Sequence, residues 1–504
     1  MKRIKTAAPA PGLSWVLALA AGLAITTACG GGTRTAAKTP TSANGTSSAA
    51  RADGATAASG TTAPTTPTAP VDPEAARRAL VEQALARVPQ ILDEVADLRG
   101  RAFLKTVPSA YQSTDDFRAF IKRETAASMG ADKAESIATA LHHIGLLPEK
   151  IDIVAALEDT MVSQAAAYYD PKQAAFFVVM AFADRMMQDV VASHELMHAL
   201  QDQHFPLRAY YGEDAKGVSS LSEDELNARR FVVEGEASFI MLAHTLKAQS
   251  GSNPLTNAAR PGLTQMIAMM AMTTTLEQMK AQAKAQAAAA GDDPDLKRSA
   301  DAMDRIPPAL LVPLFESYTK GAAAIDAAHA DGGWKAVETL FTDPPQSTEQ
   351  VLHPKDKLFP VRDLPVNVTL PSFKGLKELH QDTLGELQWR VYFQTWGIES
   401  KLSSEGWDGD RLGVYRDDNG KLVALLASEW DSPEDAQQFL AAYHEALGKR
   451  FGVAAAGNGA PPVSRPDGGM IETKRVGKRV FIIDGGSAGR LDQFARMTKF
   501  APAK

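Results

Sequence analysis

Two histidines and a glutamate stand close together in the segment His194-Glu195-Leu196-Met197-His198. On a helix, histidines four residues apart lie one turn apart on the same face, so both imidazoles can bind one metal ion. Glu195 projects about 100° away from His194, where its carboxylate can take a proton from water at that metal without being a ligand. Two nitrogen ligands, an open position and a nearby base are what a zinc hydrolase needs. The sequence therefore predicts a Zn2+ site on a helix.

The alternative interpretation is a surface helix with two solvated histidines and a glutamate. The neighbouring residues argue against it because they are mostly apolar, namely Val190, Val191, Ala192, Leu196, Ala199 and Leu200. A helix with such surroundings is expected to be buried, and buried polar side chains need partners. A metal ion would be the partner of both imidazoles.

A catalytic zinc usually takes three protein ligands, so a third one is expected elsewhere in the chain. Ser222 and Glu225 have the spacing of a capping box and predict the start of a helix. That helix carries Glu234 and Glu236 in an otherwise apolar run, where an unpaired carboxylate is costly and a metal ion would compensate for it. Gly235 lacks a side chain and is expected to let this helix approach the metal helix closely. Either acid could be the third ligand on this reasoning.

The segment His-Glu-Leu-Met-His-Ala-Leu-Gln-Asp resembles the metal helix of thermolysin-type peptidases, and Val-Glu-Gly-Glu-Ala-Ser-Phe resembles the second metal helix of related zinc aminopeptidases. Together the motifs resemble the gluzincin group of metallopeptidases. The resemblance implies that His194, His198 and Glu234 bind zinc and that Glu195 is the general base. It places Glu236 at a position that is not a ligand. It also implies a zincin-like fold, in which a strand before the metal helix pairs with an extended peptide substrate.

Two acids are expected to support the ligands indirectly. Asp202 lies one turn beyond His198 and is expected to orient a histidine, with an ordinary surface acid as the alternative. Glu236 is expected to have a similar supporting role beside Glu234.

Residues 308–354 contain further polar candidates. Ser-Thr-Glu-Gln-Val-Leu-His-Pro resembles a recurring segment of uncharacterised bacterial proteins that carry the same metal helix. Because gluzincins complete their sites with a His or Tyr that stabilises the oxyanion, Tyr318 and His353 are hypothetical catalytic residues. The alternative is a proline-punctuated loop held by its own hydrogen bonds.

The first 29 residues have the features of a bacterial lipoprotein signal peptide. A basic start, Met1–Lys5, precedes an apolar core, Trp15–Ile25, that is too short for a membrane span. Cys29 is the only cysteine, which excludes disulfides within the chain, and it stands in a sequence that resembles a lipoprotein cleavage box. We expect it to carry the lipid that anchors the protein outside the cytoplasmic membrane. Residues 30–72 are rich in Ala, Thr, Ser, Gly and Pro and predict a flexible tether.

The rest of the chain predicts a mainly helical α+β protein. A zincin-like metallopeptidase domain with a short β-sheet is expected over residues 73–370, and a small α+β module over residues 371–504. The specific expectations are helices over 73–98, 115–129, 133–146, 151–167 and 433–447, strands over 176–179 and 479–483, and a hairpin with an Asn-Gly turn at 419–420. The alternative to a substrate-binding strand at 176–179 is a plain hairpin packed in the core.

The predicted function is a zinc-dependent peptide hydrolase at the bacterial cell envelope, with a peptide or protein as substrate. An endopeptidase is favoured because the chain has no Gly-x-Met-Glu-Asn segment, which binds the substrate amine in gluzincin aminopeptidases. The net charge of -7 and the lack of a basic, aromatic-rich cluster argue against nucleic acid as a partner. The alternative function is a non-catalytic binding or assembly lipoprotein on a zincin scaffold.

Overall fold

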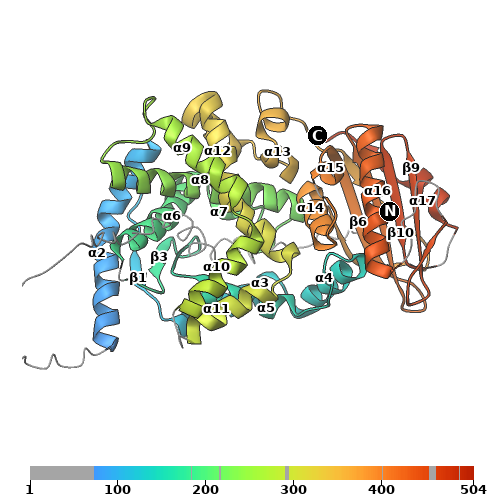
Figure 1. Ribbon diagram of the computed structural model, residues 1–504, viewed down its shortest axis with the longest axis horizontal. Coiled ribbons are helices and arrows are strands. Elements are labelled where there is room, and N and C mark those ends of the chain that lie inside the picture. The colour runs from blue at the N-terminus through green and yellow to red at the C-terminus, as the bar shows by residue number, and fades with distance from the viewer. Residues whose placement is uncertain are drawn as a thin grey trace, which may run out of the picture.

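The computed structural model describes residues 73–182, 184–214, 217–289, 294–399, 401–452, 461–486 and 489–503. The expected signal peptide, the lipid site at Cys29 and the tether lie outside these ranges. The fold is α+β and mainly helical, as predicted. A helical part with a small sheet occupies one end of the molecule, and a larger sheet occupies the other (Figure 1). Over the described ranges, every helix is too short or too polar to cross a bilayer.

The first helices confirm the sequence prediction to within a few residues. They are α2 (Pro73–Arg99), α3 (Thr114–Ser128), α4 (Ala131–Ile144) and α5 (Ile153–Gln164). Local signals explain their ends. The Ser113 side chain caps α3 by accepting a hydrogen bond from the backbone N–H of Asp116, and Gly145 ends α4 with a φ of 87° that suits glycine.

A small three-stranded sheet packs beside these helices. Its strands are β1 (Ser109–Tyr111), β2 (Ala167–Asp170) and β3 (Ala175–Val178), in the spatial order β1-β3-β2. The predicted strand from Phe176 is confirmed, and its antiparallel pairing with β2 forms the hairpin that the sequence left open as the alternative. However, β3, the strand nearest in sequence to the metal helix, lies in the middle of the sheet. It therefore has no free edge for a peptide, and β2 is the edge strand on that side.

Four helices form the centre of the helical part. They are α6 (Arg185–His204), α7 (Leu207–Tyr210), α8 (Glu223–Ser250) and α12 (Pro308–Thr342). The Ser222 side chain accepts a hydrogen bond from the backbone N–H of Glu225 and begins α8 where the sequence predicted. Helices α9 (Arg260–Thr273), α10 (Leu276–Ala289) and α11 (Pro294–Arg305) lie between α8 and α12 along the chain.

Helices α8 and α12 cross at two glycines. A Cβ atom on Gly235 would lie 2.3 Å from the carbonyl carbon of Gly321, and one on Gly321 would lie 2.4 Å from the carbonyl oxygen of Phe231. The close approach predicted for Gly235 therefore exists, but its partner is α12 and not the metal helix α6. No side chain fits between the two backbones at this crossing.

Most of the region 308–354 is helical, and the alternative of a loop held by its own hydrogen bonds applies only to residues 343–347, where Gln350 and Ser347 supply those bonds. Helix α12 runs to Thr342 with a break at Gly332 and Gly333, and α13 (Thr348–Leu352) and the short η2 (Pro354–Leu358) follow. Its first proline, Pro308, stands in the first turn, where a missing N–H costs no helical hydrogen bond. Tyr318 therefore lies on a rigid helix.

The C-terminal part is built on a six-stranded antiparallel sheet with the order β5-β6-β7-β10-β9-β8. Its elements are β5 (Lys377–Asp382), α14 (Gly385–Thr395), α15 (Lys401–Ser404), β6 (Trp407–Arg416), β7 (Leu422–Trp430), α16 (Pro433–Phe451), β8 (Val463–Ser464), β9 (Met470–Val476), β10 (Arg479–Asp484) and α17 (Leu491–Met497). The Asn-Gly turn between β6 and β7 and the helix from Pro433 are confirmed. A two-stranded sheet of β4 (Asn367–Thr369) and β11 (Lys499–Ala501) begins before the expected boundary at 371.

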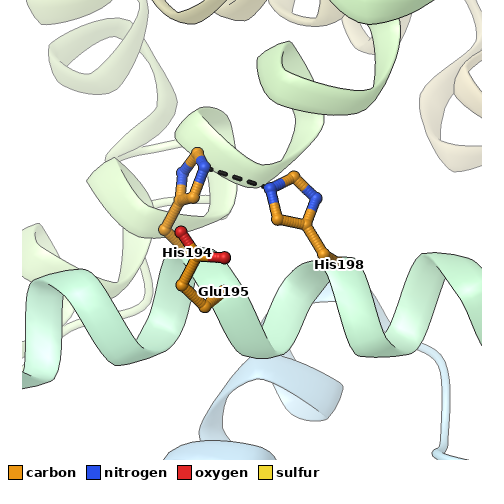
Figure 2. Close-up of side chains that lie close together, drawn as sticks. All are labelled: His194, Glu195 and His198. Atoms are coloured by element: carbon orange, nitrogen blue, oxygen red, sulfur yellow. Dashed lines mark hydrogen bonds between the residues drawn. The ribbon is translucent and has the colours of Figure 1, made fainter. Parts of the chain in front are cut away.

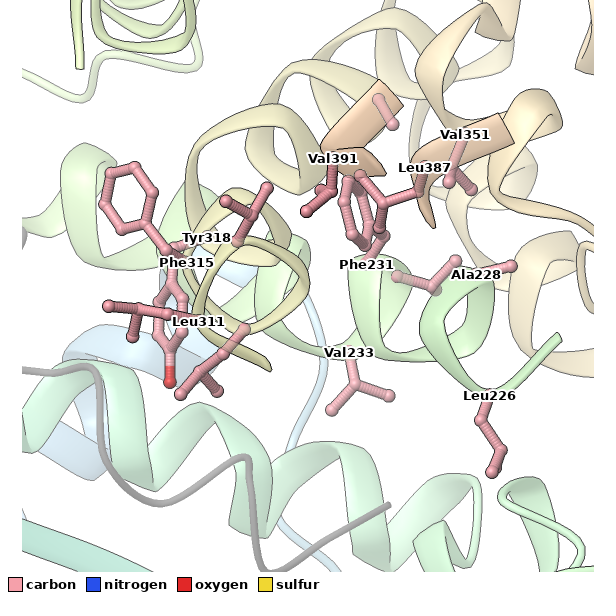
Figure 3. Packing of buried hydrophobic residues seen from close by; sticks show 14 of the residues in the cluster. Leu226, Ala228, Phe231, Val233, Leu311, Phe315, Tyr318, Val351, Leu387 and Val391 are labelled. Atoms are coloured by element: carbon pink, nitrogen blue, oxygen red, sulfur yellow. The ribbon is translucent and has the colours of Figure 1, made fainter. Parts of the chain in front are cut away.

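The two parts of the molecule share one hydrophobic core. Leu387 and Val391 of α14 pack in the same cluster as Phe231 of α8 (Figure 3). A smaller core, with Phe481 and Phe494, covers the other face of the large sheet.

Candidate metal centre

Three potential ligand atoms converge between α6 and α8. On α6, His194, Glu195 and His198 lie side by side, and one potential ligand atom of each lies within 4.8 Å of the others (Figure 2). The two histidine Nε2 atoms are 3.2 Å apart. Glu234 of α8 places its Oε2 atom 3.2 Å from Nε2 of His194 and 3.5 Å from Nε2 of His198. Zinc bonds of about 2.0–2.2 Å in a tetrahedral site put ligand atoms about 3.3 Å apart, which these separations match.

The cluster is buried. The exposed fractions are 1% for His194, 2% for Glu195, 5% for His198 and 0% for Glu234, which excludes the solvated surface helix. Two polar atoms of the cluster, Nδ1 of His194 and Oε1 of Glu234, have no hydrogen-bond partner. A buried carboxylate oxygen without a partner is costly, and a cation between the ligands would compensate for it. The donor set and this unpaired oxygen both fit zinc.

The electrostatics of the cluster favour an ionised Glu234. Burial acts to raise the pKa of Glu234, but the two imidazoles outweigh it and lower the pKa to about 2. Burial lowers the pKa of His194. For His198, burial is outweighed by the Glu234 carboxylate, which raises the pKa to about 9. The negative charge of Glu234 thus attracts a positive charge between the rings.

Glu195 points toward the edge strand of the small sheet. Its Oε2 atom accepts a hydrogen bond of 3.2 Å from the backbone N–H of Tyr169 on β2. Burial raises the pKa of Glu195 to about 8, and the nearby Glu234 charge acts in the same direction. In its ionised form, a carboxylate with such a pKa is a stronger base than an ordinary glutamate.

A chain of hydrogen bonds orients His198. Its Nδ1 atom lies 2.8 Å from Oε1 of Gln201. The Gln201 Nε2 atom donates to the Val233 carbonyl and to Oε2 of Glu236, both at 2.9 Å, so its Oε1 atom must face the ring. Because an amide oxygen only accepts, Nδ1 carries a proton, so Nε2 is the nitrogen that can bind a metal once the ring is neutral. Oε1 of Glu236 accepts a bond of 2.5 Å from Nε of Arg99.

This chain agrees in part with the sequence prediction. Glu236 supports the cluster indirectly, as expected, while Gln201 and Arg99 were missed. The i, i+3 spacing of His198 and Gln201 was a usable signal. The contact between Glu236 and Arg99 had no such signal in the sequence, because Arg99 comes from the distant helix α2.

The expected role of Asp202 is wrong. Its two carboxylate oxygens accept hydrogen bonds of 2.8 Å from the Tyr169 hydroxyl and from the backbone N–H of Leu207. Both oxygens are therefore engaged away from the histidines. Asp202 joins β2 to the turn after α6, and its neighbour Gln201 has the orienting contact.

Of the two candidates for oxyanion stabilisation, the structure brings only Tyr318 to the cluster. The Tyr318 ring is buried and stacks on His194, with centroids 5.2 Å apart and an interplanar angle of 22°. The Nε2 atom of His353 instead lies 2.9 Å from Oε1 of Glu386 on α14. Helix α13, just before His353, contacts the first turn of α8 through Thr348 and Asp224.

Asp224 and Glu234 are ten residues apart on one helix, a separation of about 15 Å. His353 is thereby held near the far end of α8, which corrects its expected place beside the metal ligands.

Replacing Gln201 with Leu is expected to weaken zinc binding by about 10–100-fold, because the His198 ring loses the group that orients it. Competition with a chromophoric chelator would measure the affinity. The adjacent variant Asp202→Asn is the control and should bind zinc like the wild type, since Asp202 contacts no ligand. Equal affinities for all three proteins would contradict the assigned role of Gln201.

Comparison with known protein families matches residues 373–495, less than half of the chain, to a family described as a domain of unknown function (DUF8575). No curated protein and no solved structure matches the chain. The matched segment contains all six strands of the large sheet and helix α14. The ligand cluster on α6 and α8 lies outside it.

Proposed function

We propose that the protein is a zinc-dependent peptidase, with His194, His198 and Glu234 as metal ligands. The observation that carries the proposal is the triangle of three ligand atoms, 3.2–3.5 Å apart, with Glu195 beside it. A bound zinc ion would supply Lewis acidity toward the scissile carbonyl and lower the pKa of a water molecule. In the gluzincin-like arrangement that the sequence resembles, the substrate is a peptide or protein.

Residues of the chain would carry out proton transfer, oxyanion stabilisation and substrate binding. Glu195 would accept the proton of the attacking water and deliver it to the leaving amine nitrogen. Tyr318, stacked against His194, is the candidate that would stabilise the oxyanion with its hydroxyl. The edge strand β2 is suited to hold an extended peptide, because the Tyr169 N–H points toward Glu195 and away from β3. The sequence of residues 1–29 supports a location on the outer side of a bacterial membrane.

Metal analysis and a cleavage assay test this proposal. The purified protein is expected to contain one zinc ion per chain and to hydrolyse members of a quenched fluorescent peptide library. Chelation should abolish hydrolysis and lower the melting temperature, and zinc should restore both. At 100-fold excess of free zinc over Kd, binding contributes about 2.7 kcal/mol to stability. A protein purified without zinc, and unable to bind it, would refute the proposal.

A binding or assembly protein with a structural metal is the second candidate. It is favoured by the burial of the cluster, in which no residue is more than 5% exposed. Stoichiometric zinc, a chelator-sensitive melting temperature and no hydrolysis of the peptide library would together select this function.

A further inference from the structure

Two arginines are buried to 1% exposure among the described residues, and they differ sharply in their partners. Arg99 forms an ion pair with Glu236 and lies over the ring of Trp334, 4.2 Å from its centroid. Arg230 on α8 forms no such close ion pair among the described residues, and the Glu223 carboxylate acts on its charge only from farther away. Its Nη1 atom donates to Oδ1 of Asn227, while its Nε and Nη2 atoms have no hydrogen-bond partner.

An unpaired buried guanidinium is unfavourable for folding. Arginine keeps its charge at any physiological pH, so it cannot escape the cost of burial by losing a proton. The cost of removing such a charge from water is offset only by a paired anion with good geometry. The planar group, with two free donors, suits a carboxylate. Arg230 therefore indicates an anion that binds to the protein and is not part of it.

Arg230 lies next to the metal centre. It precedes Glu234 by four residues, so both side chains project from one face of α8, about 6 Å apart along the axis. The hydroxyl of Tyr211 and Nδ2 of Asn227 are also buried without hydrogen-bond partners. Burial and the charge of Glu234 raise the pKa of Tyr211 well above its usual range, while the charge of Arg230 acts in the opposite direction. The charges of both residues therefore act on the Tyr211 hydroxyl.

We propose that Arg230, with Tyr211 and Asn227, binds a carboxylate group of the substrate beside the metal centre. The assignment rests on the proposed peptidase function and narrows its substrate class to peptides with a carboxylate near the scissile bond. That carboxylate is either the C-terminus of the peptide or an Asp or Glu side chain. The guanidinium would accept it through two parallel hydrogen bonds.

The matched pair of buried arginines gives the first test. Arg230→Met removes an unpaired charge and should leave the melting temperature unchanged or raise it. Arg99→Met leaves Glu236 without its cation and should lower the melting temperature by several degrees. If Arg230→Met melts as early as Arg99→Met, then Arg230 is a structural residue and the proposal is wrong.

Binding of uncleaved peptides gives the second test. In the full-length Glu195→Gln variant, calorimetry would compare acetyl-Ala-Ala-Ala with a free C-terminus, its C-terminal amide, and acetyl-Ala-Glu-Ala amide. At least one carboxylate-bearing peptide should bind at least tenfold tighter than the uncharged amide, and the preferred one identifies the source of the carboxylate. Adding Arg230→Met should bring the ratio of the two dissociation constants, uncharged amide over carboxylate-bearing peptide, close to one. Equal binding of all three peptides, or a preference that survives Arg230→Met, would overturn the assignment.

Repeating the titrations with chelator separates the two proposals. If the wild type contains no zinc and cleaves nothing, but the preference for carboxylate persists and depends on Arg230, then the peptidase function fails and the anion site stands. If zinc binding and cleavage are present but the preference is absent, then only the anion site fails.

Discussion

Glu195→Gln is expected to lower kcat/KM for peptide hydrolysis by about 10²–10⁴-fold while zinc stays bound. The amide keeps the size of the side chain and can still accept the hydrogen bond from Tyr169 N–H. It cannot take a proton from water, so only the base is lost. Cleavage of a quenched fluorescent peptide and elemental analysis of the same sample would measure rate and zinc together.

An exposed acid away from the cluster provides the control for this experiment. Glu277→Gln on α10 removes the same charge from the chain and should retain the wild-type rate. Hydrolysis by Glu195→Gln at the wild-type rate would show that another group takes the proton. Loss of zinc from that variant would instead show that Glu195 holds the site together.

Gly235→Ala is expected to destabilise the protein by about 3 kcal/mol or more, because overpacking a tight interface costs about 1–3 kcal/mol even where neighbours can adjust. The new methyl group would lie 2.3 Å from a backbone carbon of Gly321, which cannot rotate away. Helices α8 and α12 would have to separate, and Glu234 and Tyr318 would move with them. Urea unfolding would measure the loss, and chelator competition would show weaker zinc binding.

Gly262→Ala is the matched control for the glycine crossing. It is also in a helix, α9, but a Cβ atom there would have no neighbour within 4 Å. The free energy of unfolding of this variant should stay the same or rise by up to about 1 kcal/mol, because alanine is a better helix former than glycine. If both variants unfold at the same urea concentration, then the contact between α8 and α12 is softer than the structure indicates.

Local features of this fold could be predicted from the sequence because short-range chemistry decides them. Helix α8 begins where the Ser222 side chain accepts a hydrogen bond from Glu225, three residues later. The hairpin of β6 and β7 depends on the single turn at Asn419 and Gly420. The cluster of His194, His198 and Glu234 could be anticipated for the same reason, since two ligands share a helix turn and the third interrupts an apolar run.

Long-range contacts left no such signal. Gly235 indicated a close approach, but nothing near it in sequence showed that Gly321 is the partner. Arg99 contacts the candidate metal centre from helix α2, which ends 86 residues before α6 begins (99 to 185). Asp202 and Gln201 were equally placed beside His198, and only the Tyr169 hydroxyl, which engages Asp202, decides between them.

Helix α14 belongs to the segment that matches the family of unknown function, yet it completes the interior around α8. Leu387 and Val391 are 0% exposed in that shared interior, and a Cβ atom on Gly385 would lie 1.7 Å from Oδ1 of Asp224. The segment that matches the family therefore shares a packed core with the rest of this chain. A protein with this segment but without α6 and α8 would have to cover the apolar side of α14 with another surface.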